Sequence, residues 1–118
     1  MQQLRVSILF LLSSLSLINP AIAEPIYLAC NLVIEGNQSP INFTVDEGAG
    51  TVSITIVTSG STRTVRGTFA PDKVVVDEGD VRWEINRINL GFSRVLVALG
   101  NSTDSGRCEI QSAPKRAF

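Results

Sequence analysis

The chain has 118 residues, with 10 Lys or Arg against 11 Asp or Glu, and it contains no histidine. This length suits one small domain, and a formal net charge of −1 without a block of basic residues argues against a nucleic-acid partner. The lack of histidine removes the commonest general base and the commonest metal ligand.

The first 23 residues have the layout of a secretory signal peptide. Arg5 is the only charge before Glu24, an apolar run extends over 6–18, and Ala21-Ile22-Ala23 supplies small residues for signal peptidase. The run is shorter than the ~20 residues that a membrane-spanning helix needs. We therefore predict cleavage near Ala23, no membrane span, and a secreted or periplasmic protein.

The mature protein is predicted to be a single β domain at 24–111 with a short flexible tail at 112–118. Its two cysteines, Cys30 and Cys108, lie near opposite ends of this domain. In an oxidising compartment they are expected to form one disulfide, which would stabilise the fold by about 4.5 kcal/mol through loop closure. Lipidation at Cys30 is disfavoured because it would leave Cys108 without a partner.

Apolar and polar residues alternate along most of the mature chain, as in half-buried strands. Such runs lie at 26–34, 41–45, 51–56, 64–69, 74–76, 81–86, 95–98 and 107–111. Gly, Pro, Asn, Asp and Ser separate them, with a turn or bulge expected at Leu90-Gly91. No segment shows helical periodicity, so we predict an all-β domain of about eight short antiparallel strands, either a small meander barrel or a β-sandwich.

The disulfide favours the barrel over the sandwich, because it would tie the first strand to the last, and these are neighbours when a meander closes. Closure would also remove the exposed sheet edges that invite aggregation. The bulky residues Phe43, Phe69 and Trp83 are expected to fill the interior. Cys108 and Ile110 are expected to point inward from the last strand.

The sequence Val-Asp-Glu-Gly occurs twice, at 45–48 and 76–79, and each copy follows a predicted strand. The second copy begins a stretch of eight residues that contains Asp77, Glu78, Asp80 and Glu84. Calcium takes six to eight oxygen ligands from such flexible segments. Tight turns between strands are the simpler interpretation of Asp and Gly here, so we predict no cofactor and keep calcium as the alternative.

Arginines recur along the second half of the domain, at positions 82, 87, 94 and 107. We expect them on the outer face, paired across strands with acids such as Glu84 and Glu109.

Catalytic motifs are scarce: no free thiol remains if the disulfide forms, and no Gly-x-Ser-x-Gly motif occurs. We predict a non-enzymatic protein-interaction or inhibitor-type module that uses loops at the strand ends, such as 35–40 (EGNQSP) and 100–106 (GNSTDSG). Its partner would be an extracytoplasmic protein or a small ligand. The alternatives are a small-molecule or lipid carrier that uses the barrel interior and a minimal carboxylate-based hydrolase.

Candidate contact residues follow from the late apolar run and the loop after it. Val95 and Val97 alternate with residues that are also apolar, so one face could meet a partner. We group them with Leu99, Asn101 and Asp104 as candidate binding residues.

Overall fold

A computed structural model describes residues 23–113. The predicted signal peptide, except for Ala23, and the last five residues of the predicted tail lie outside the described residues. Nine strands and one short 3-10 turn are present: β1 (Ile26–Ile34), β2 (Asn37–Asp46), β3 (Thr51–Ile56), β4 (Ser61–Arg66), β5 (Thr68–Phe69), β6 (Lys73–Asp77), β7 (Val81–Asn86), β8 (Gly91–Leu96), η1 (Val97–Leu99) and β9 (Ser102–Gln111). Within the described residues, no helix is long and apolar enough to cross a membrane.

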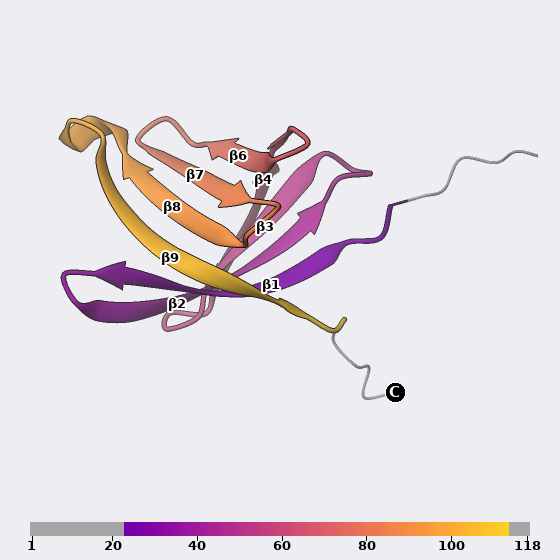
Figure 1. The fold of residues 1–118 in the computed structure, drawn as a ribbon, viewed down its shortest axis with the longest axis horizontal. Helices are drawn as coiled ribbons and strands as arrows, with labels where there is room; N and C mark the ends of the chain where they lie inside the picture. Colours follow the sequence, from indigo (N-terminus) through magenta and orange to yellow (C-terminus); the bar gives the residue numbers. More distant parts are fainter. Residues whose placement is uncertain (1–22, 114–118) are drawn as a thin grey trace, which may run out of the picture.

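All strands pair antiparallel in one sheet of order β4-β3-β2-β1-β9-β8-β7-β6-β5, which curls into a nearly closed barrel (Figure 1). β1 lies beside β9, and Cys30 stands directly opposite Cys108 in that pairing. The two residues form a disulfide that links positions 78 residues apart. The predicted all-β barrel and its disulfide are therefore confirmed.

The break in the barrel lies between β4 and β5, which are consecutive in the chain and separated only by Gly67. One continuous strand was the expectation over 64–69, but the chain bends so that β4 pairs with β3 and β5 pairs with β6. A Cβ at residue 67 would lie 3.0 Å from Val52 Cγ2 and 3.3 Å from Phe69 Cε1. This glycine permits the close approach at the bend, and the bend accounts for nine strands instead of about eight.

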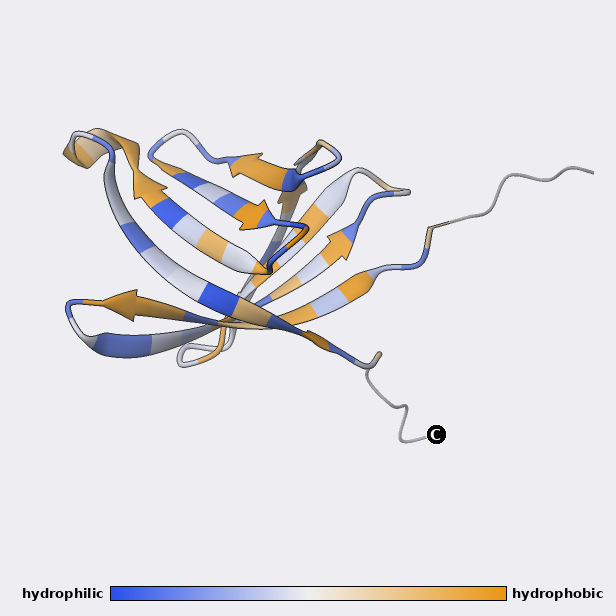
Figure 2. Cartoon of the chain, in the orientation of Figure 1, coloured by the Kyte–Doolittle hydropathy of each residue, from blue (hydrophilic) through white to orange (hydrophobic). Residues whose placement is uncertain are grey.

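The predicted alternation holds through the core, and polar and apolar positions alternate visibly along the strands (Figure 2). The buried core consists of Leu28, Cys30, Leu32, Ile41, Phe43, Val45, Val52, Ile54, Val74, Val76, Trp83, Ile85, Phe92 and Cys108. The Phe43 ring makes edge-to-face contacts with Trp83 and Phe92, both at centroid distances of 5.7 Å. These three rings fill the middle of the barrel, while Phe69 at the bend is partly buried.

Two segments predicted as loops are mostly strand. β2 begins at Asn37, which leaves a turn of only Glu35 and Gly36, and β9 begins at Ser102. Pairing with neighbouring strands overrides the polar composition, because Asn37 is opposite Ile34 and Ser102 is opposite Leu96. Conversely, the strand predicted at 95–98 ends at Leu96 as part of β8, and 97–99 form the 3-10 turn η1.

Ile110 lies on the inward face of β9, opposite buried Leu28, as the alternation predicts, but it is 63% exposed. β8 covers β9 only as far as Arg107. The last residues of β9 therefore project beyond β8, and Ile110 reaches the open end of the barrel although it lies on the same face as buried Cys108.

Candidate binding site at one end of the barrel

The antiparallel order places the connections β2–β3, β5–β6 and β7–β8 at one end of the barrel, which we call the mouth end. The turns β1–β2, β3–β4 and β6–β7, together with η1, lie at the other end, which we call the η1 end.

An apolar pocket of about 270 Å³ opens at the mouth end. Its apolar lining comes from the first and last strands and from the strand ends around them: Ile26, Leu28, Val45, Val74, Ile85, Leu90 and Ile110. Ala23, Glu24, Glu47, Asn86 and Arg87 complete it. We call this pocket the apolar mouth.

The rim of the apolar mouth is held by Arg87, whose Nη2 donates to Glu47 Oε1 at 2.7 Å. Its Nη1 donates to the carbonyl oxygen of Ala70 at 2.8 Å, and its backbone N–H donates to that of Asp72 at 2.8 Å. One residue thus connects all three turns of the mouth end. Arg87 lies in the β7–β8 turn and not on an outer strand face, but it binds an acid as expected.

The β7–β8 turn directs Leu90 into the apolar mouth. The side-chain carbonyl oxygen of Asn86 accepts the backbone N–H of Ile88 at 2.8 Å and of Asn89 at 2.9 Å. Leu90 has φ 63°, which is uncommon for a residue with a Cβ. The turn itself lies at 87–89, just before the turn or bulge predicted at Leu90-Gly91, and Gly91 is the first residue of β8. Ile88, in the same turn, is 79% exposed.

The first Val-Asp-Glu-Gly copy belongs to the mouth end, where Asp46 Oδ1 accepts the backbone N–H of Ala49 at 3.1 Å. The second copy lies at the η1 end, where Asp77 Oδ1 accepts the backbone N–H of Gly79 at 2.9 Å. In both copies the aspartate stabilises the turn, as such short side chains do. In both, the following glutamate binds an arginine that is distant in sequence.

Glu78 of the second copy connects the β6–β7 turn to β4 across the break in the barrel. Its carboxylate accepts Nε and Nη2 of Arg63, each at 2.6 Å, and Nε1 of Trp83 at 2.8 Å. The hydrogen bond from Arg63 lowers the pKa of Glu78 against the opposing effect of burial, and the hydrogen bond from Trp83 lowers it further. The pKa of Arg63 is raised by the same hydrogen bond.

Two of the four acids considered for calcium, Glu78 and Glu84, are bound by different cationic side chains. Glu78 is bound by Arg63 and Trp83, while Glu84 pairs with Arg82 at 2.9 Å and with Lys73 at 3.7 Å. No group of three or more His, Cys, Asp or Glu side chains that could hold a metal ion occurs in 23–113. The calcium hypothesis gains no support from these contacts.

The candidate contact residues of the late apolar run lie at the η1 end. Val95 is buried, whereas Val97 and Leu99 are 40% and 68% exposed. Asn101, also exposed, has φ 62°, and Asp104 binds Arg94. Arg94 stands opposite the buried Trp83, so the expectation that it lies on the outer face is wrong.

The mouth-end residues were not among the binding candidates inferred from sequence. Leu28, Val45 and Ile85 are indistinguishable in sequence from other core positions. Only the unequal lengths of β8 and β9 reveal that the barrel leaves them accessible at one end.

The chain has no significant match among protein-family models, curated proteins or solved structures.

Proposed function

We propose that the protein is an exported binding module that holds an apolar side chain of a protein partner in the apolar mouth. The observation that carries the proposal is an apolar pocket with a few fixed polar groups at the end of a rigid barrel, which is the usual form of a binding site. The leader-like N-terminus and the Cys30–Cys108 disulfide support export into an oxidising compartment.

The size of the apolar mouth favours a side chain over a lipid. Its volume of about 270 Å³ lies below the range of roughly 300–1,000 Å³ that is typical for drug-sized ligands. It exceeds the roughly 150 Å³ cavity that accommodates a benzene molecule. One bulky side chain fits this space, and the rings of Phe43, Trp83 and Phe92 block a deeper chamber. A lipid carrier is therefore the second choice.

Exposed isoleucines at the mouth end favour a protein partner over a free small molecule. Ile26 and Ile110 line the pocket and are 46% and 63% exposed, while Ile88 in the adjacent turn is 79% exposed. Protein interfaces combine such an apolar centre with a polar rim, which the pair of Arg87 and Glu47 would supply here.

The test is affinity capture from the extracytoplasmic fraction of the source organism, followed by calorimetry with the purified partner. Ile110→Asp should abolish binding because it places a charge in the apolar mouth. Leu99→Asp is the matched control, since Leu99 is 68% exposed at the opposite end of β9. Loss of binding with the Leu99 variant alone would show that the η1 end binds the partner, and recovery of no partner would count against the proposal.

A further inference from the structure

A concave area lies on the outer face of β2, β1 and β9, away from the apolar mouth. It is a groove of about 470 Å³, which is within the size range of ligand sites. We call it the amide groove, because Asn31, Gln38 and Asn42 line it together with Arg107 and Glu109. We propose that the amide groove binds a neutral oligosaccharide.

The floor of the amide groove is formed by a small residue on a rigid part of the sheet. Ala29 lies between Asn42 on β2 and Glu109 on β9, so two long polar side chains flank a position that has only a methyl group. The disulfide joins β1 to β9 one residue further along, at Cys30. A rigid site loses little conformational entropy when a ligand binds.

The polar side chains of the amide groove are available to a ligand. Asn31, Gln38, Asn42 and Glu109 are exposed and form no side-chain hydrogen bond with another residue of 23–113. Each amide can donate and accept at once, as a sugar hydroxyl also does. Arg107 is oriented by a hydrogen bond from its Nη2 to the carbonyl oxygen of Asn89 at 3.0 Å.

Charge balance favours a neutral ligand over an anionic or cationic one. The positive charge of Arg107 is matched in the same groove by the negative charge of Glu109. Val33 and Pro40 add small apolar surfaces to the lining, and such surfaces can contact the C–H groups of a sugar ring.

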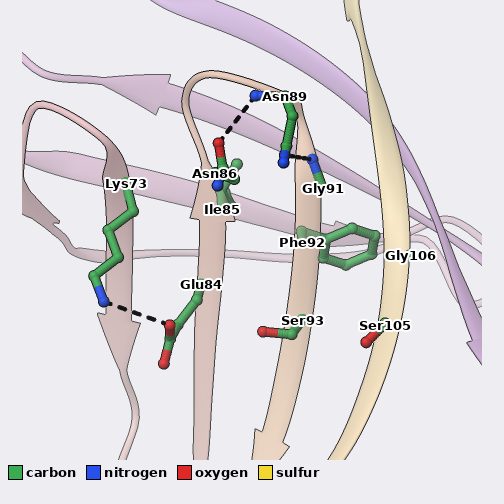
Figure 3. A pocket seen from close by; sticks show the side chains of 10 residues that line it. All are labelled: Lys73, Glu84, Ile85, Asn86, Asn89, Gly91, Phe92, Ser93, Ser105 and Gly106. Atoms are coloured by element: carbon green, nitrogen blue, oxygen red, sulfur yellow. Dashed lines mark hydrogen bonds and ion pairs between the residues drawn. The ribbon is translucent and has the colours of Figure 1, made fainter.

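The outer face continues beyond the amide groove in a way that suits an extended chain. A second groove of about 340 Å³ lies on the β6–β9 side (Figure 3). Gly106 lines both grooves. One row of outward positions crosses both areas: Glu84, Ser93, Ser105, Val33 and Gln38 on β7, β8, β9, β1 and β2. Five adjacent strands span roughly 19 Å. Lys73 and Glu84, which form an ion pair, line this second groove, and Glu84 also binds Arg82.

The test is a titration of the disulfide-bonded mature domain with cellotetraose and with the tetramer of N-acetylglucosamine. Chemical shifts of the backbone amides are measured by NMR. Shifts should concentrate on the outer positions of β1, β2 and β9 for at least one of these neutral sugars, with a Kd of about 1 mM or lower. Shifts with neither sugar, or with an acidic galacturonate tetramer alone, would overturn the proposal.

Variants separate the amide groove from other surfaces. Asn42→Ala should weaken sugar binding about five- to tenfold through the loss of a hydrogen bond, and Ala29→Leu should weaken it by filling the floor. Thr58→Ala, at an exposed residue in the β3–β4 turn, should leave the Kd unchanged. Equal effects of the Asn42 and Thr58 variants would contradict the assignment. Ile110→Asp should not affect sugar binding, so this test is independent of the apolar mouth.

Discussion

Removal of the Glu78 carboxylate should destabilise the barrel at its break, where β4 and β5 are not paired with each other. Glu78→Ala removes the bidentate pair with Arg63, whose side chain is 43% exposed. An ion pair with an exposed partner contributes roughly 0.2–1 kcal/mol. The substitution also leaves Nε1 of Trp83, a residue only 3% exposed, without its acceptor, which costs about 1–3 kcal/mol. We therefore expect a loss of about 2–3 kcal/mol in the free energy of unfolding.

The assay is equilibrium denaturation monitored by fluorescence, for which Trp83 is the single tryptophan. The pKa of Glu78 is lower in the folded protein than in the unfolded chain, chiefly because of Arg63. Its contribution is therefore present above the unfolded pKa of about 4.3 and is lost as the pH falls through the lower folded pKa. Glu78→Gln should accordingly lose less stability relative to the wild type in acid than at neutral pH.

Glu84→Ala is the matched control, because Glu84 also binds an arginine but lies on the outer face with its side chain 30% exposed. It should cost less than about 1 kcal/mol. Equal destabilisation by the Glu78 and Glu84 variants would refute the reasoning that the contacts of Glu78 at the break stabilise the barrel. A double-mutant cycle with Arg63→Ala separates the ion pair from the hydrogen bond to Trp83, since only the former couples the two sites.

The packing of β9 is tested by Gly106→Ala and by removal of the disulfide, with Gly48→Ala as a control outside β9. Gly106→Ala should cost about 3 kcal/mol or more, because its Cβ would lie 1.9 Å from the carbonyl oxygen of Asn31 and 2.4 Å from Phe92 Cε1. Gly48→Ala should change stability little in the same denaturation assay, since no atom lies closer than 3.6 Å. Replacement of Cys30 and Cys108 by serine should cost roughly 4 kcal/mol, and intact mass before and after reduction should show both thiols protected in the native protein.

The fold was largely predictable because a strand pattern of period two is visible in the sequence wherever one face is buried. Residues 26–34 and 41–45 illustrate this, since their alternating apolar residues become the inner faces of β1 and β2. The bend at Gly67 was missed because an alternating pattern continues through it. Residues 37–40 contain no alternating apolar residues of their own, so the sequence predicts a loop there, although these residues pair with the mostly apolar residues 31–34 of β1.

Most of the candidate site could not be predicted, because it depends on which strands end first. Cys108 and Ile110 alternate with polar neighbours in the same way, yet Cys108 is buried and Ile110 is 63% exposed, because β9 extends beyond its pairing with β8. The sequence predicts both Val-Asp-Glu-Gly turns. It does not predict the arginines that bind their glutamates, because Arg87 is 40 residues from Glu47 and Arg63 is 15 residues from Glu78.

The different chemistry of the two barrel ends explains why we assign binding to only one of them. At the η1 end, inward positions carry charge: Arg63 faces inward opposite Ile54, and Arg94 opposite Trp83. Arg63 is neutralised by Glu78, and Arg94 by Asp104, so both inward-facing arginines of this end already have an acidic partner. At the mouth end, the Arg87–Glu47 pair lies on the rim and leaves the inward apolar groups uncovered. Apolar surface that no part of the described chain covers gains free energy from a partner, whereas a ligand at the η1 end would have to displace existing ion pairs.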